Sequence, residues 1–345
     1  MAGRATRSAS RAALRAEAAE ATGPLGALSH DALGVIFDGL ADPLQPVVAV
    51  ALSSTCLGLR TPLQAALEVL KERHARAVAL CCKIKCPVHV DGVAVNYVPM
   101  TCVLLRDAEE LDCYLDPDCR PSQGLTADDM ATIAMLLDGG SLPRLNEMNL
   151  SNTATGDACM KALCDGLHHG AAPGLLGLAF ASSRLGPVGT KALAAALKRG
   201  ALPNLEGLQL ANNSLGDEGA ALLASAARKL PALKDLTLWQ CEIGDEGVAS
   251  LVASLGKDDF KKLEMLDLQR NELTDRGFIT LASELNQGRL PMLRELLVRY
   301  APDDGAIAAE LEEAASRRKI NLDDFEPQWD QDVDADSDED ENDLL

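Results

Sequence analysis

Aromatic residues are scarce in this chain of 345 residues, where Phe, Trp and Tyr together make up only 3 %. Because 47 % of the residues are nevertheless hydrophobic, we expect a core built mainly from leucine and alanine. Long apolar runs are also missing. The longest local run, Pro46 to Leu52, falls far short of the roughly 20 residues that a membrane span requires. The sequence therefore predicts no membrane-spanning segment.

Positive charge is under-represented as well. The chain has 32 Lys and Arg residues against 52 Asp and Glu residues, which gives a formal net charge of −20. Twelve of the acidic residues lie between Asp323 and Leu345, a stretch without a single basic residue. Direct nucleic-acid binding needs a basic footprint, so the composition argues against a nucleic-acid partner.

Signatures of catalysis and of metal binding are missing too. The chain has no G-x-S-x-G, H-E-x-x-H or G-x-x-x-x-G-K-[ST] motif. Its ten cysteines have neither the spacing of a disulfide framework nor the paired C-x-x-C spacing of a zinc site. We therefore expect no catalytic residues, no cofactor and no metal. Reduced thiols predict a cytoplasmic or nuclear protein.

A repeat of 28 to 30 residues is the main feature that the chain does have. Self-similarity at such a period is typical of a solenoid, in which each unit buries its apolar face only against its neighbours. The first leucine of each copy lies at Leu145, Leu175, Leu205, Leu233, Leu263 and Leu293.

The third copy is the clearest and follows the spacing L-x-x-L-x-L-x-x-N-x-L. Leu208 and Leu210 are two residues apart, so in a strand both point into the core. Asn213 can bond backbone groups where the chain leaves the strand, and a stack of such residues would form a ladder. Asp217 suits the N-cap of a following helix. The residues from Ala220 to Leu230 have helical spacing.

These units resemble the leucine-rich repeats of the ribonuclease-inhibitor subclass. The resemblance covers residues 125–318 and implies an α/β solenoid, or horseshoe, with a parallel sheet on its concave face and helices outside. A capping-box pair, Thr126 and Asp129, predicts a helix that caps the N-terminal end of the array. Because this scaffold serves inhibitors, receptors, GTPase activators and ubiquitin-ligase receptors, the resemblance implies a non-enzymatic protein that binds other proteins.

The sequence divides into five segments. Each is predicted from its composition or pattern, and a small all-α segment precedes the solenoid. The segments are an Arg-rich extension (1–27), a helical segment (28–75), an irregular Cys-containing linker (76–124), the leucine-rich repeats with six strand/helix units (125–318) and a disordered acidic tail (319–345). The first segment is predicted to be disordered or loosely helical. Alternatively, it resembles an organelle transit peptide, because it is rich in Arg and Ser and poor in acids.

The helical segment is similar to an F-box, the module that docks substrate receptors onto the Skp-type adaptor of cullin ubiquitin ligases. Leu33, Ile36, Phe37 and Leu40 form one helical stripe, and Leu28 precedes them at a capped helix start. The resemblance implies that these five residues dock the adaptor. Alternatively, the stripe packs the helices together and onto the end of the solenoid.

The concave face is the predicted partner-binding surface. Residues that flank the core leucines form rows across the repeats, and Trp, Tyr and Arg are the residue types that most often anchor interfaces. The alternative is that Trp239 and Tyr300 cover a thinly packed C-terminal cap. The predicted binding residues are Trp239, Gln240, Asp267, Gln269, Arg270, Arg299 and Tyr300.

The acidic tail suggests a second function. A repeat array with such a tail resembles Ran GTPase-activating proteins, which implies a regulator of a Ran-like small GTPase as the alternative to a ubiquitin-ligase receptor. Ser337 precedes three acidic residues, a context that favours acid-directed kinases, so it is a candidate phosphorylation site.

Overall fold

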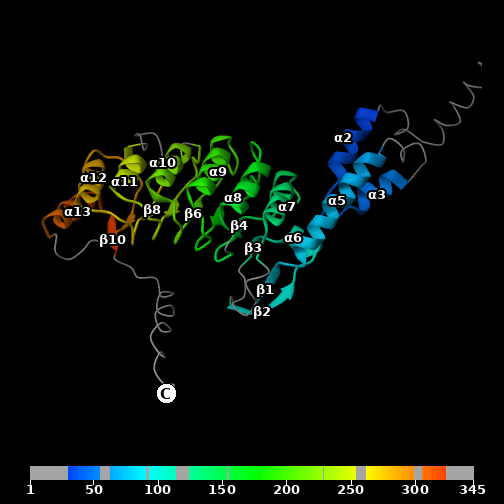
Figure 1. The fold of residues 1–345 in the computed structure, drawn as a ribbon, viewed down its shortest axis with the longest axis horizontal. Helices are drawn as coiled ribbons and strands as arrows, with labels where there is room; N and C mark the ends of the chain where they lie inside the picture. The colour runs from blue at the N-terminus through cyan, green and yellow to red at the C-terminus, as the bar shows by residue number, and fades with distance from the viewer. Residues whose placement is uncertain are drawn as a thin grey trace, which may run out of the picture.

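The computed structural model describes residues 30–54, 63–90, 93–113, 124–153, 155–227, 229–253, 262–298 and 305–323. Leu28, Arg299, Tyr300 and Ser337 lie outside these residues. Within them, a repeating stack of strands and helices is preceded by a smaller helical unit at one end (Figure 1).

The solenoid is built on one parallel sheet of eight strands in the order β10-β9-β8-β7-β6-β5-β4-β3. Each strand is three residues long, and its central apolar residue lies opposite that of the next strand, as Leu208 lies opposite Leu236. The strands are β3 (Glu110–Asp112), β4 (Glu147–Asn149), β5 (Gly177–Ala179), β6 (Gly207–Gln209), β7 (Asp235–Thr237), β8 (Met265–Asp267), β9 (Glu295–Leu297) and β10 (Asn321–Asp323).

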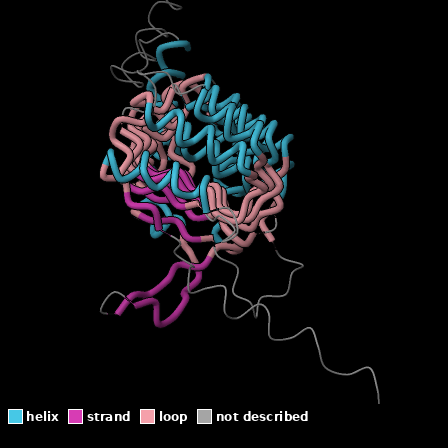
Figure 2. The backbone as a smooth tube through the Cα atoms, turned by 90° about the vertical axis from the view of Figure 1, so that its left-hand side faces the viewer, coloured by secondary structure: helices cyan, strands magenta, loops and turns pink. Residues whose placement is uncertain are grey.

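Helices cover one face of this sheet. Figure 2 shows them as a layer on one side of the stacked strands, and neighbouring helices pack side by side along the array. The leucines of the strands and helices form one continuous buried core between the layers. The helices are α7 (Ala127–Asp138), α8 (Gly156–Gly166), α9 (Pro187–Lys198), α10 (Gly216–Ala227), α11 (Asp245–Ala253), α12 (Asp275–Asn286) and α13 (Gly305–Arg318).

The α/β solenoid with outer helices is therefore confirmed, but the sheet extends beyond the six predicted strands. β3 lies in the segment predicted to be irregular, and β10 lies at the start of the predicted disordered tail. Each added strand pairs with the end of the array, with Leu111 opposite Met148 and Leu322 opposite Leu296. β3 and β10 thus pair the outer edges of β4 and β9, and they are themselves the end strands of the sheet.

An asparagine ladder ties consecutive repeats together, as the repeat spacing predicts. The Asn213 side chain is buried at the end of its strand and bonds backbone groups of two repeats. Its oxygen accepts from two N–H groups and its nitrogen donates to three carbonyls. The partners are Ser183 N (3.2 Å), Leu185 N (2.9 Å), Phe180 O (2.8 Å), Leu210 O (2.9 Å) and Ala211 O (3.2 Å).

The other copies fill this place with different side chains. Asn271 repeats the pattern of Asn213 two turns of the solenoid further on, and accepts from Cys241 N at 2.9 Å. Cys241 itself, in the fourth copy, donates its thiol to the Leu210 carbonyl at 3.2 Å. Ser183 donates its hydroxyl to the Leu150 carbonyl at 3.0 Å. Hence the ladder continues through copies that lack asparagine.

A second ladder runs between the helices, and it corrects the prediction for Asp217. The helix begins at Gly216, so Asp217 lies inside its first turn. The Asp217 carboxylate accepts from Gly244 N (2.7 Å) and Gly247 N (2.9 Å) of the next repeat instead of capping its own helix. A Cβ at Gly247 would lie 2.5 Å from Asp217 Oδ1. Glycine at this place is therefore required by the close approach of two helices.

The N-terminal unit consists of α2 (His30–Leu40), α3 (Val47–Ser54) and the long helix α5 (Gln64–Cys81). A small core of its own holds the three helices together. After it come the antiparallel hairpin of β1 (Lys85–Val90) and β2 (Val93–Pro99) and the short helix α6 (Cys102–Asp107). The segment 76–124, predicted to be irregular, thus contains regular structure between α5 and the solenoid.

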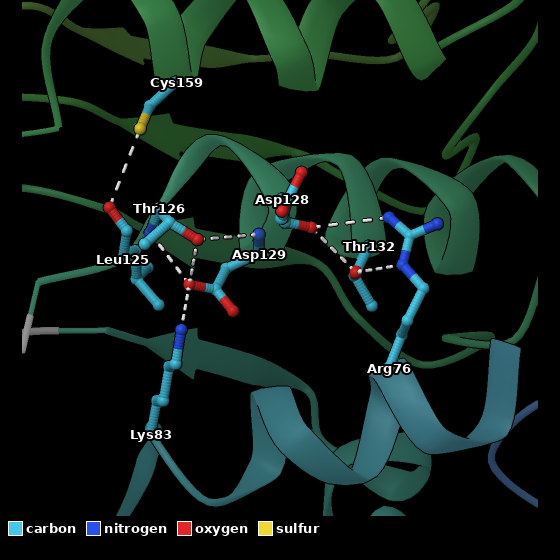
Figure 3. Close-up of polar contacts among 8 residues, drawn as sticks. All are labelled: Arg76, Lys83, Leu125, Thr126, Asp128, Asp129, Thr132 and Cys159. Atoms are coloured by element: carbon cyan, nitrogen blue, oxygen red, sulfur yellow. Dashed lines mark hydrogen bonds and ion pairs between the residues drawn. The ribbon is translucent and has the colours of Figure 1, made fainter. Parts of the chain in front are cut away.

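Polar contacts fasten α5 to α7, the first helix of the solenoid (Figure 3). Arg76 Nε donates to Thr132 Oγ1 at 3.2 Å, and Lys83 Nζ lies 2.6 Å from Asp129 Oδ2. Asp129 also forms the predicted capping box with Thr126, which is confirmed. Burial raises the pKa of Asp129, but hydrogen bonds from Lys83 and Thr126 outweigh it and hold the pKa below its ordinary value.

Candidate functional site: the concave face

The sheet face that points away from the helices, here called the concave face, is formed by the first and third residues of each strand. Strand side chains alternate between the two faces, so the middle residue enters the core. This alternation explains why Leu208 and Leu236 are buried while their neighbours are accessible or half-buried. A groove of about 300 Å³ crosses this face. Its accessible lining residues include Glu110, Glu147, Gly177, Gly207, Asp235 and Thr237.

Two glycines form the floor of the groove. Gly177 and Gly207 are directly opposite each other on adjacent strands. A Cβ added at Gly207 would meet no atom within 4 Å, and one at Gly177 would come no closer than 3.5 Å to the Glu147 side chain. Larger residues would fit at both positions, so neither glycine is required by packing. The pair instead leaves open space above the sheet.

The strands that carry this face are acidic. Of the 24 residues in the eight strands, seven are Asp or Glu and none is Lys or Arg. Glu110 and Glu147 are adjacent on one side of the glycine floor, and Asp235 lies on the other side. Burial raises the pKa of Asp235, and the nearby charge of Glu264 raises it further. The groove therefore has negative walls around a small, uncharged floor.

Basic residues near the strands lie one position before them and are already paired. Lys234 Nζ is 2.6 Å from Glu206 Oε2, and Arg294 Nη1 is 3.6 Å from Glu264 Oε2. The hydrogen bond to Glu206 raises the pKa of Lys234. Each of these bases pairs with an acid of its own row. The charge of Lys234 also lowers the pKa of the neighbouring Asp235, so the row offsets part of the negative charge of the strands.

Asp267 is the most buried acid of the sheet. It continues the row of Gln209 and Thr237 on the next strand, yet only 7 % of its surface is exposed. Its Oδ1 accepts from Gln269 N at 3.0 Å. Burial raises the pKa of this carboxyl to about 6, and the hydrogen bond from Gln269 lowers it only partly. Asp267 was predicted as a binding residue, and the structure places it on the concave face beside the groove.

We expect Asp267→Asn to stabilise the protein near neutral pH. The folded-state pKa of about 6 exceeds the value of about 3.9 for an unfolded chain. The folded state therefore holds the proton longer, and stability falls as the pH rises from about 4 to about 6. The asparagine avoids this loss, so we expect a gain of about 2 kcal/mol at pH 7.5 and almost none at pH 4.

Urea unfolding of both proteins between pH 4 and pH 8 measures this effect. Glu272→Gln is the matched control, because it removes an exposed acid without changing a buried one. A difference between Asp267→Asn and the wild type that stays constant across this range would contradict the raised pKa.

The other predicted residues of the concave face lie after the strands, in the turns. Trp239 and Gln269 are buried, with only 3 % of Trp239 exposed, which corrects the expectation that they point outward. Gln240 and Arg270 are exposed and adopt left-handed backbone conformations with φ of 49° and 52°. The Arg270 guanidinium lies over the Trp239 ring, 5.1 Å from its centre. Two consecutive turns thus pack on each other and leave little of the indole accessible.

A second groove, of about 510 Å³, follows these turns. Gln240 lines it together with Ser182, Asn212 and Arg184. The structure therefore separates the predicted set: Asp267 belongs to the concave face, while Gln240 belongs to the groove along the turns. The residues on either side of Leu208, Gly207 and Gln209, were not among the predicted binding residues. The two-residue alternation around Leu208 was the signal for them.

The predicted adaptor-docking stripe lies mostly inside the N-terminal unit. Leu33 and Phe37 are buried in its core, Ile36 is half-buried, and Leu40 is 37 % exposed. Accessible apolar side chains lie instead on α3, where Val47 and Val48 are 69 % and 51 % exposed. The burial of Leu33 and Phe37 agrees with the alternative that the stripe packs the helices together.

The described residues offer little chemistry beyond these surfaces. Seven of their cysteines are free thiols, and the sulfur atoms of Cys81 and Cys102 are 3.9 Å apart. Burial raises the pKa of the Cys81 thiol to about 12, and the nearby Cys102 adds to this. Across the described ranges no group of three or more His, Cys, Asp or Glu could hold a metal ion. None of the described helices is long and apolar enough to cross a membrane.

Short parallel strands, outer helices and an asparagine ladder together define a leucine-rich-repeat α/β solenoid. Comparison with family models agrees: residues 201–224 and 261–282 match the family described as Leucine Rich repeat. The chain thus contains leucine-rich repeats within an α/β solenoid. Comparison with curated proteins finds no sequence that matches it.

Proposed function

We propose that this protein is a non-enzymatic scaffold that binds a protein partner on its concave face. The observation that carries this proposal is the open groove over β3 to β7, which is wide, shallow and lined by strand residues. Eight strands about 4.8 Å apart span roughly 34 Å, which suits the patch that one protein partner covers. The groove needs no glycine for folding at Gly207, so its open floor is best explained by binding.

A bulky side chain in the groove tests this proposal. Gly207→Trp places a bulky side chain on the floor, where an added Cβ meets no atom within 4 Å, and Val188→Trp places the same side chain on an exposed position of α9 as the control. We expect proteins retained from a cell lysate by the immobilised wild-type chain to be at least tenfold depleted on Gly207→Trp and unchanged on Val188→Trp. Identical retained sets on all three would contradict binding at the concave face.

A second candidate is a substrate receptor of a cullin ubiquitin ligase, with the N-terminal unit docking a Skp-type adaptor. The apolar surface of α3 supports it, because a helix that is apolar on nearly all sides normally needs a partner. Docking would then use Val47 and Val48 instead of Leu33 and Phe37. We expect Val48→Asp to abolish retention of a purified adaptor, and Val103→Asp on α6 to leave it unchanged. No retention by the wild type would exclude this function.

A regulator of a Ran-like small GTPase remains the alternative use of the same concave face. It rests on the resemblance of the repeat array and the acidic tail to Ran GTPase-activating proteins. GTP hydrolysis by a purified GTPase of this type, measured with and without the intact chain, distinguishes the two. Acceleration that Gly207→Trp removes would favour the regulator, and an unchanged rate would exclude it.

A further inference from the structure

We infer that the concave groove holds an extended segment of another protein that carries two basic residues four positions apart with a large side chain between them. This inference rests on the proposed function and specifies the chemistry of the partner. It follows from the charge of the strands, the spacing of Glu147 and Asp235, and the open space above Gly177 and Gly207.

Charge selects a basic partner. The eight strands of the solenoid sheet contain seven acids and no Lys or Arg, and the bases of the neighbouring row are already paired with Glu206 and Glu264. Glu110 and Glu147 have no hydrogen bond or ion pair from their side chains to any residue that the structure describes. Complementary potentials of this kind steer association and exclude partners of like charge.

Spacing selects an extended segment. Glu147 and Asp235 hold equivalent positions on β4 and β7, three strands apart, which corresponds to about 14 Å. An extended chain advances about 3.3 Å per residue, so side chains four residues apart are separated by about 13 Å and point the same way. A segment that crosses the strands would therefore place one base near Glu147 and the second near Asp235.

The glycine floor selects the residue between the two bases. The side chain two positions after the first base points toward the sheet between Glu147 and Asp235. Gly177 and Gly207 occupy this part of the groove, where nothing lies within 4 Å of an added Gly207 Cβ. A long or aromatic side chain fits this space, and its burial adds apolar contact area to the two ion pairs.

Asp267 is an independent observation in favour of a cationic ligand. It lies on the strand next to Asp235, it is more than nine-tenths buried, and its Oδ1 accepts a hydrogen bond from Gln269 N. An acid in this state costs stability. A basic group of the partner near β8 would offset this cost. The surface that favours a basic ligand therefore includes β8, one strand beyond Asp235.

A labelled peptide tests the inference on the intact chain. The probe is fluorescein-Gly-Lys-Ser-Trp-Ser-Lys-Gly, measured by fluorescence anisotropy. The spacing control, fluorescein-Gly-Lys-Lys-Ser-Trp-Ser-Gly, has the same composition with adjacent lysines. We expect Glu147→Lys and Asp235→Lys each to weaken binding at least tenfold. The exposed Glu218→Lys on α10 makes the same charge change outside the groove, and we expect a change of less than twofold.

Several outcomes would overturn the inference. If Glu147→Lys, Asp235→Lys and Glu218→Lys weakened peptide binding equally, binding would depend on net charge alone. Binding that none of them changes would place the peptide elsewhere, for example on the acidic tail. Equal affinity for the two peptides would exclude the proposed spacing. Gly207→Trp keeps the test valid if a charge reversal disturbs folding, because it blocks the central side chain without altering charge.

The two proposals fail in different ways. In the first case, Gly207→Trp loses the proteins retained from the lysate, but Glu147→Lys and Asp235→Lys do not change peptide binding. This result would support the scaffold function and contradict the proposed basic segment. In the second case, the peptide binds in the groove, but Gly207→Trp retains the same lysate proteins as the wild type. This result would support the basic ligand of the groove and contradict the proposed scaffold function.

Discussion

Replacing Asn213 with alanine is expected to lower the free energy of unfolding by about 4 kcal/mol, because several buried backbone groups lose their partner at once. The carboxamide oxygen satisfies Ser183 N and Leu185 N of the preceding repeat, and the nitrogen satisfies three carbonyls. Alanine has no polar atom to replace it. Water has poor access, since only 5 % of Asn213 is exposed.

Urea unfolding followed by circular dichroism measures this loss. Asn204→Ala is the matched control, because Asn204 is exposed and makes a single bond, to the Pro173 carbonyl at 2.8 Å. We expect the control to cost at most about 1 kcal/mol. A loss for Asn213→Ala as small as that for Asn204→Ala would show that the ladder contributes little to stability.

Hydrogen exchange locates the effect within the chain. In a solenoid each repeat contacts mainly its neighbours, so the weakened contact lies between the second and third repeats. We expect the amides of Ser183 and Leu185 to lose protection first in Asn213→Ala. Amides that Asn271 holds, such as Cys241 N, should keep more of their protection. Uniform loss across the array would instead indicate that the repeats unfold only as a whole.

Trp239→Ala is expected to cost about 3 kcal/mol or more, as truncation of a buried tryptophan generally does. The indole is almost fully buried beneath the turns and lies under the Arg270 guanidinium. Its removal leaves a cavity and exposes the surfaces that it covers. Arg270→Ala removes only the cation above the ring, and we expect it to cost about 1 kcal/mol.

Unfolding in urea tests Trp239→Ala. It is followed by circular dichroism, because the substitution removes one of the two tryptophans of the chain and so changes the fluorescence signal itself. Trp239→Phe is the conservative control and should retain most of the stability, because the aromatic ring still fills the site. If Trp239→Ala is as stable as the wild type but no longer binds its partner proteins, Trp239 is an interface anchor after all. If Trp239→Ala is destabilised and Trp239→Phe still binds the partner proteins, the role of Trp239 is to pack the turns.

The repeat pattern was enough to predict the strands and helices of the array. The sequence of each copy indicates its local structure. In the third copy, Leu208 and Leu210 are two residues apart, Asn213 follows the strand, and a helix-forming segment comes next. Such signals are short-range, because they depend on side-chain alternation and backbone hydrogen bonding within about ten residues. The capping box of Thr126 and Asp129 is equally local, and it is confirmed.

Features that depend on a neighbouring repeat were predicted less well. β3 and β10 carry too few core residues to be recognised as strands alone, and only pairing with β4 and β9 establishes them. Asp217 has a suitable position to cap its own helix, yet its carboxylate bonds the next repeat. Trp239 follows a strand in a position expected to be exposed, but the succeeding turn covers it. Each outcome depends on contacts about 30 residues away.

The sequence by itself determined that this protein is a leucine-rich solenoid, because the period, the leucine spacing and the asparagine position are properties of each repeat. Only the tertiary structure decided which side chains the concave face presents. Stacking brings Glu147, Gly177, Gly207 and Asp235 from four separate repeats into one groove, and it buries Trp239 in the turn that follows β7. The physical reason is that the register between strands, which no single repeat encodes, aligns these residues in space.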